Sequence, residues 1–168
     1  KTQLAYSVAH ELELKMFEFH TQTTSTAKDL FYVYDTLSHF QDAHGTAALI
    51  KDKYVFYNAF GKAILLACDE KEVGQFSNNE QPFIPDELSQ KPARSVVLID
   101  EIDKAPRDLP NDILNDILTM SFTVTETQKT FKADNQFRPI IILTSNSEKN
   151  LPEAFFAAMF FLSYCFSG

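Results

Sequence analysis

Apolar residues recur at the helical period in four stretches of the chain, and these stretches are therefore predicted to be helices. They are residues 3–14, residues 27–40, residues 57–68 and residues 108–120. In the first stretch Leu4, Val8 and Leu12 recur at every fourth residue, on one face of the predicted helix. The hydroxyl-rich segment of residues 21–26 precedes the second stretch and is expected to cap its helix.

Other segments carry the patterns of β-strands. Residues 15–20 alternate between apolar and polar, whereas residues 95–99 and 140–143 are short apolar runs typical of strands buried on both faces of a parallel sheet. Residues 122–132 alternate on either side of a polar turn near Gln128 and predict a hairpin. Because strands alternate with helices, we predict an α/β domain with a largely parallel central sheet flanked by helices.

Two of the predicted parallel strands end in polar residues. Asp100 and Glu101 follow the strand of residues 95–99, and the sequence Thr-Ser-Asn of residues 144–146 follows the strand of residues 140–143. Ligands of open parallel sheets bind at the carboxyl ends of the strands. Both polar endings are therefore expected to lie at the edge of the sheet where a ligand would bind.

Composition and charge exclude several classes of protein. The 168 residues are 45% hydrophobic and 23% charged, as in a packed soluble globule, and the net charge of −8 argues against a dedicated nucleic-acid binder. The longest apolar run, residues 154–162, is shorter than the roughly 18–20 residues that span a bilayer, and no secretory leader opens the chain. A cytoplasmic location without a membrane span is expected. The two cysteines and four histidines form no metal-ligand spacing.

The acidic pair Asp100-Glu101 has the chemistry that Mg²⁺-dependent nucleotide hydrolysis requires. The first carboxylate can hold Mg²⁺ through its water shell, and the second can polarise a water toward a γ-phosphate. Asn146, after the other apolar strand, can give that water a neutral hydrogen bond. Simpler interpretations remain open, because the acidic pair could cap the next helix and Asn146 could be an ordinary loop residue.

Lys1 and Thr2 stand directly before an amphipathic helix. In a phosphate loop a lysine at this place meets the β- and γ-phosphates, and the hydroxyl that follows binds Mg²⁺. The four glycines of the chain complete neither a phosphate loop nor a dinucleotide motif. Taken alone, the pair is explained more simply as a chance beginning of the chain.

Together these segments resemble a known family. VVLIDEIDKAP (residues 96–106) resembles the Walker B strand of an AAA+ ATPase, and IIILTSNSEKNLPEAF (residues 140–155) resembles its sensor-1 strand and the segment after it. KTQLAYSVAHEL (residues 1–12) resembles the end of a Walker A motif running into its helix. FHTQTTSTAKDLFY (residues 19–32) and KAILLA (residues 62–67) are similar to the MoxR-like branch. The resemblance extends to about residue 156.

The resemblance implies a P-loop NTPase-type fold, the AAA+ large α/β subdomain, with ATP and Mg²⁺ as its ligands. It assigns Lys1 and Thr2 to phosphate and Mg²⁺, and Asp100 to the Mg²⁺ shell. It assigns Glu101 to the attacking water and Asn146 to the positioning of that water. It also implies ring oligomers, usually hexamers, and the chaperone-like remodelling or maturation of protein partners, which often carry a von Willebrand factor A domain.

Three features of the family have no counterpart in residues 1–168. They are the glycine-rich half of Walker A, the helical lid subdomain with its sensor-2 arginine, and the arginine fingers, whose positions resemble Ala157 and Ala158. Residues 1–168 are therefore expected to form the large subdomain with an incomplete phosphate loop and without the lid. The alternative is a non-catalytic AAA+-like interaction module that binds nucleotide poorly, since side chains cannot replace the backbone N–H groups of a phosphate loop.

Overall fold

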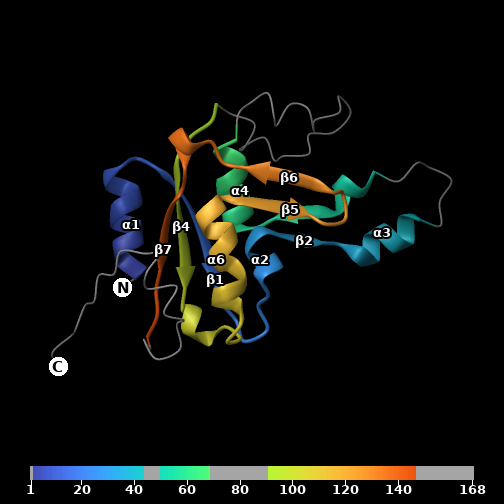
Figure 1. Ribbon diagram of the computed structural model, residues 1–168, viewed down its shortest axis with the longest axis horizontal. Coiled ribbons are helices and arrows are strands. Elements are labelled where there is room, and N and C mark those ends of the chain that lie inside the picture. Colours follow the sequence, from blue (N-terminus) through green and yellow to red (C-terminus); the bar gives the residue numbers. More distant parts are fainter. Residues whose placement is uncertain (1, 44–49, 69–90, 147–168) are drawn as a thin grey trace.

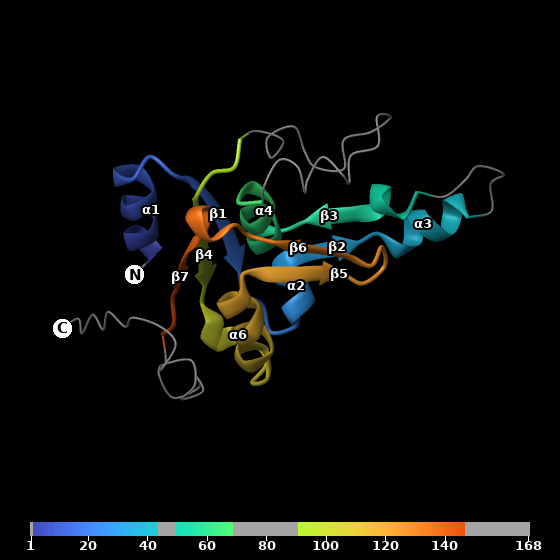
Figure 2. The ribbon, with the colours of Figure 1, turned by 45° about the horizontal axis from the view of Figure 1, so that its top comes forward.

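The computed structural model of the chain describes residues 2–43, 50–68 and 91–146. At its centre lies a parallel sheet with the strand order β1-β4-β7, formed by β1 (Lys15–His20), β4 (Ser95–Asp100) and β7 (Ile140–Leu143). Figures 1 and 2 show α1 (Thr2–Glu11) on one side of this sheet and α4 (Ala59–Leu66) on the other. The predicted α/β class, with a parallel sheet flanked by helices, is confirmed.

The core lies around the central strand. Residues 96–99 of β4 are fully buried, as the apolar run predicts, because the strand has a neighbour on each edge and helices over it. Phe60 and Ile64 of α4 and Ile113 of α6 (Leu109–Thr119) are also fully buried and belong to the same core. By contrast, β7 is only half-buried along its length, because it is an edge strand of the described sheet.

Helix α1 packs through small residues rather than through the leucines that recur along one of its faces. Ala5 and Ala9 are buried, whereas Leu4 and Leu12 are exposed. Alanine side chains allow the helix axis to approach β4 closely, and the larger residues remain on the flanks of the contact. The leucines and the alanines both recur at the same period of four residues. The period alone therefore does not indicate whether the leucines or the alanines are buried.

The helix predicted over residues 27–40 is interrupted by a strand, which corrects the sequence interpretation. The chain forms α2 (Ala27–Phe31), β2 (Tyr32–Tyr34) and α3 (Thr36–Asp42). Strand β2 pairs antiparallel with β3 (Val55–Tyr57), which follows the short 3-10 helix η1 (Lys51–Tyr54). The run Tyr-Val-Tyr favours a strand once such a partner is present, but the partner lies more than 20 residues further along the chain.

The predicted hairpin is confirmed, and it lies beside the two-stranded ribbon that β2 and β3 form. It consists of β5 (Ser121–Val124) and β6 (Lys129–Lys132), with Gln128 in the left-handed region at φ 57°. The rings of Tyr32 and Tyr57, from the ribbon, lie 6.4 and 6.2 Å from the ring of Phe122. The hydroxyl of Tyr32 donates to Glu126 at 2.8 Å, so the hairpin turn is attached to the end of α2.

The remaining described elements are short connections, the 3-10 helices η3 (Ile102–Lys104) and η4 (Asn135–Phe137). None of the helices in the described part of the chain has both the length and the apolar character that crossing a membrane requires.

Candidate functional site

All three parallel strands end at the same edge of the sheet, and a polar residue stands at the end of β1 and of β4 and directly after β7. His20 of β1 stands directly opposite Asp100 of β4. Ile99 pairs with Leu143 of β7, which places Thr144 beside Asp100. The backbone N–H of Thr21 donates to the carbonyl of Asp100 at 3.1 Å and fixes the end of β1 against β4. The predicted gathering of the two polar strand endings is therefore found in the structure.

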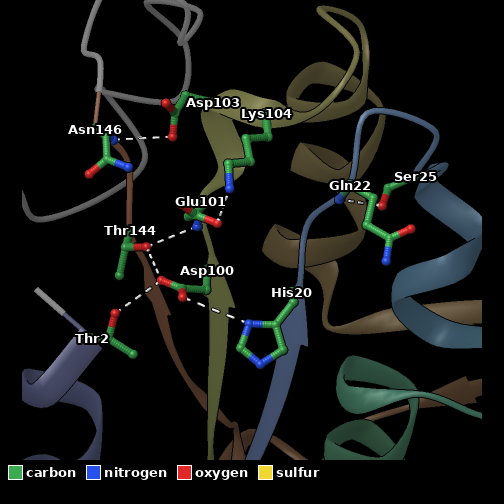
Figure 3. A network of polar contacts seen from close by, with 10 residues as sticks. All are labelled: Thr2, His20, Gln22, Ser25, Asp100, Glu101, Asp103, Lys104, Thr144 and Asn146. Carbon is green, nitrogen blue, oxygen red and sulfur yellow. Dashed lines mark hydrogen bonds and ion pairs between the residues drawn. The ribbon is translucent and has the colours of Figure 1, made fainter.

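Helix α1 begins at this same edge. The hydroxyl of Thr2 donates to Oδ1 of Asp100 at 3.2 Å, although the two residues are 98 positions apart in the sequence (Figure 3). The structure thus brings together the two residues that the sequence assigns to a Mg²⁺ shell. Lys1 lies outside the described residues, as do the finger positions Ala157 and Ala158.

Thr144 connects the ends of β4 and β7. Its hydroxyl donates to Oδ1 of Asp100 and accepts the backbone N–H of Glu101 at 2.9 Å. Its backbone also donates to Ile99 and accepts from Ile102, at 3.0 and 2.9 Å. Thr144 was not predicted as a site residue. The available signal was its place directly after an apolar strand, but the register that sets it beside Asp100 could not be known from the sequence.

Glu101 is held in a turn that residues with side chains rarely adopt. Its φ of 56° and ψ of 48° lie in the left-handed region, which typically costs about 1–3 kcal/mol when the surroundings impose it. Two hydrogen bonds to Thr144 impose this backbone conformation here. One comes from the N–H of Glu101 and the other from the N–H of Ile102. Such outliers cluster at functional sites. The turn lets the chain leave the sheet immediately after the acidic pair.

The carboxylate of Glu101 forms an ion pair with Lys104 of η3. The two groups are 2.5 Å apart, and both side chains are partly exposed to solvent. The hydrogen bond to Glu101 raises the pKa of Lys104 against the opposing effect of burial, and the charges of Asp103 and Asp100 raise it further. Glu101 therefore has a cationic partner that was not anticipated from the sequence.

His20 and Tyr6 complete the surroundings of Asp100. Nδ1 of His20, an exposed side chain, lies 3.8 Å from Oδ2 of Asp100, the oxygen that neither threonine contacts. A hydrogen bond to Glu18 raises the pKa of Tyr6 on α1, and desolvation and the charge of Asp100 act in the same direction. The edge is therefore acidic around Asp100.

Asn146 lies at the same edge but is held through its backbone. Its N–H donates to the carboxylate of Asp103 at 3.1 Å, and its side chain is exposed. Figure 3 shows Asn146 beyond Thr144 on the chain that leaves β7, on the same side of the network as Glu101. The bond to Asp103 orients this segment without using the side-chain amide of Asn146.

The donor set suits a hard cation that keeps most of its water. Within residues 2–43, 50–68 and 91–146, no three or more His, Cys, Asp or Glu side chains gather as metal ligands. The edge offers one partly buried carboxylate, Asp100, and two hydroxyls, from Thr2 and Thr144. Mg²⁺ dehydrates reluctantly and is commonly bound by one or two carboxylates together with water and phosphate oxygens. The residues present fit that ion.

Comparison with protein-family models gives no match, and comparison with curated proteins gives none either. Among solved structures, the chain is similar to one described as "a putative ATPase from Cytophaga hutchinsonii", with a TM-score of 0.44 and 14% sequence identity. The similarity covers 92% of this chain and 35% of that protein, so the chain spans about a third of its length. A likeness at this level does not identify a function.

Proposed function

We propose that this chain is the nucleotide-binding core of an ATPase of the AAA+ class, similar to the MoxR-like branch. The observation that carries the proposal is the 3.2 Å hydrogen bond between Thr2, at the start of α1, and Asp100, at the end of β4. A hydroxyl at the beginning of a helix and a carboxylate at the end of a parallel strand are the two protein ligands of Mg²⁺ in P-loop NTPases. The resemblance of residues 1–12 and 96–106 to Walker A and Walker B supports the same assignment.

Each residue at the edge has a role in this proposal. Bound Mg²⁺ would neutralise charge on the phosphates, with Thr2 and Asp100 holding it. Thr144 keeps Oδ1 of Asp100 oriented through its hydroxyl. The N-terminus of α1 supplies a positive helix end next to an otherwise acidic edge, and the phosphates would lie there with Lys1.

Glu101 is the proposed general base. It would accept a proton from the water that attacks the γ-phosphate, and Asn146 would hold that water with its side-chain amide. In this structure Lys104 occupies the Glu101 carboxylate, so the base must exchange that ion pair for the water before it can act. The left-handed turn at residue 101 fixes the backbone, and the exchange therefore needs only side-chain rotation.

The remodelling of protein partners, including ones with a von Willebrand factor A domain, and a hexameric ring are also proposed, on the sequence resemblance alone. A non-catalytic interaction module is the second candidate, and the Lys104–Glu101 ion pair favours it because the base is already occupied. The two candidates differ in one observable quantity, which is the rate of ATP turnover.

The test is turnover by residues 1–168 preceded by a glycine-rich phosphate loop. We expect Glu101→Gln to lower the rate by at least about 100-fold and to leave ATP binding intact, because the amide keeps the shape but cannot take a proton. Glu11→Gln, at the far end of α1, is the matched control and should leave the rate unchanged. If Glu101→Gln and Glu11→Gln turn over ATP equally, Glu101 is not the base, and the second candidate replaces the first.

A further inference from the structure

The turn after Asp100 fixes the backbone of both residues in the Glu101–Lys104 ion pair. Ile102, which lies between them, is 1% exposed, and its N–H donates to the carbonyl of Thr144 at 2.9 Å. The N–H of Lys104 donates to the carbonyl of Glu101, also at 2.9 Å. Because η3 is anchored in this way, movement at the pair is expected in the two side chains rather than in the backbone.

The ion pair itself is open to solvent and can be exchanged. Nζ of Lys104 lies 2.5 Å from Oε2 of Glu101, and the two side chains are 52% and 37% exposed. Water and salt screen such a pair, and exposed pairs contribute little to stability. The adjacent carboxylate, that of Asp103, accepts the N–H of Asn146 at 3.1 Å and is directed toward the chain that leaves β7 (Figure 3). A stronger anion at this edge can therefore displace Glu101 from Lys104.

Lys104 carries the positive charge of this edge. Of the ten residues in the network of Figure 3, it is the one lysine or arginine, and three of the others are carboxylates. Arg94 and Arg138 stand just before β4 and β7, at the opposite edge of the sheet, and donate to backbone carbonyls at 3.1 and 2.8 Å. Within this network, a phosphate at the carboxyl edge would therefore find its cationic side chain in Lys104.

The position of Lys104 also suits the terminal phosphate of a nucleotide. A water that Glu101 activates would lie about 2.6–3.2 Å from its carboxylate, and it would attack from about 3–3.5 Å. The phosphate under attack would therefore lie roughly 6 Å from that carboxylate. Lysine has a flexible four-carbon stem and binds phosphate as a point charge. Lys104 already contacts Glu101, so rotation of its side chain is sufficient to cover this distance.

We propose that Lys104 detects the terminal phosphate of a nucleoside triphosphate. Lys104 leaves Glu101 for that phosphate, and the same movement frees the carboxylate to take the attacking water. The exchange makes and breaks no covalent bond, and it is driven by the larger negative charge of the phosphate. With a nucleoside diphosphate Lys104 stays on Glu101. The inference rests on the proposed nucleotide-binding function and adds to it the selection of triphosphates over diphosphates.

The test is the affinity of residues 1–168, preceded by a glycine-rich phosphate loop, for two nucleotides in the presence of Mg²⁺. Isothermal titration calorimetry compares ADP with the non-hydrolysable β,γ-imido analogue of ATP. We expect Lys104→Met to lower the affinity for the triphosphate analogue at least about tenfold and to leave that for ADP within about twofold, because methionine keeps the stem but loses the charge. Lys104→Arg keeps the charge and should retain most of the preference for the triphosphate.

Lys53→Met is the matched control, because Lys53 is an exposed lysine of η1 that takes no part in the network of Figure 3. Circular dichroism verifies that each variant is folded. A loss of triphosphate affinity that Lys53→Met reproduces, or an equal loss for both nucleotides in Lys104→Met, overturns the inference. Binding of neither nucleotide by the unsubstituted chain contradicts the proposed function and the inference together, whereas binding of both without an effect of Lys104→Met overturns the inference alone.

Discussion

Thr144 shows how one hydroxyl can hold a site together. It orients the carboxylate of Asp100 and at the same time satisfies the N–H of Glu101, whose left-handed backbone would otherwise leave that donor unpaired. Valine has nearly the same shape as threonine but can do neither. The side chain therefore links the proposed metal ligand to the proposed base.

We predict that Thr144→Val lowers the free energy of unfolding by about 1–3 kcal/mol, because the partly buried N–H of Glu101 loses its partner. Urea denaturation followed by circular dichroism measures this change. Thr23→Val, on an exposed turn, is the control and is expected to stay within about 0.5 kcal/mol of the unchanged chain. An equal effect of the two substitutions would show that Thr144 does not organise the edge.

Individual site residues could be predicted from sequence only where one local pattern contains them. Asp100 and Glu101 end an apolar run, and that pattern was sufficient to place them at the edge. His20 and Lys104 were missed as site residues, because their relevance depends on strand register and on a left-handed turn. Neither feature has a signature in the residue types.

At the scale of elements, α2 and α4 approach each other so closely that one position must be glycine. A Cβ atom built on Gly61 would lie 2.0 Å from the carbonyl oxygen of Phe31, which also accepts the N–H of Asn58 at 2.8 Å. The obstacle is backbone and cannot rotate away. Gly61 thus allows the end of α2 to lie directly against α4.

We predict that Gly61→Ala destabilises the fold by roughly 3 kcal/mol, at the upper end of the usual cost of overpacking. Thermal and urea unfolding both measure it. Lys62→Ala, the next residue of the same helix, should change stability by less than about 0.5 kcal/mol. Comparable stability of the two variants would mean that α2 and α4 can separate without cost.

Elements with a clear local pattern were predicted correctly, whereas β2, whose local pattern is helical, was not. The hairpin of β5 and β6 was predicted from alternation around one turn. Residues 27–40 have a continuous helical period, yet β2 forms within them because β3 offers hydrogen bonds from a distant part of the chain. Tertiary pairing therefore overrode the local pattern.

At the scale of the whole molecule, buried and hydrogen-bonded tyrosines make stability depend on alkaline pH. The hydrogen bond to Asp42 raises the pKa of Tyr54 to about 12, and burial raises the pKa of Tyr57. Tyrosine in an unfolded chain titrates near pH 10. The folded chain therefore holds these protons more tightly than the unfolded chain does.

We predict that the free energy of unfolding is maintained up to about pH 10 and then falls as the pH approaches the folded pKa values, because the unfolded state releases protons first. Urea denaturation at intervals from pH 8 to pH 11.5 measures the decline. The double variant Tyr54→Phe and Tyr57→Phe should show a shallower decline. A constant or rising stability in this range, or a decline that the double variant leaves unchanged, would contradict the assignment.

The central claim is that the carboxyl edge of the sheet binds ATP with Mg²⁺, and melting temperature tests it most directly. Residues 1–168 preceded by a glycine-rich loop should melt several degrees higher with millimolar ATP and Mg²⁺, since a ligand at about 100 times its Kd adds ~2.7 kcal/mol. The shift should require Mg²⁺ and disappear in Asp100→Ala, and residues 1–168 alone should show little shift. No shift in the extended chain, or one that persists without Mg²⁺ or in Asp100→Ala, would contradict the account.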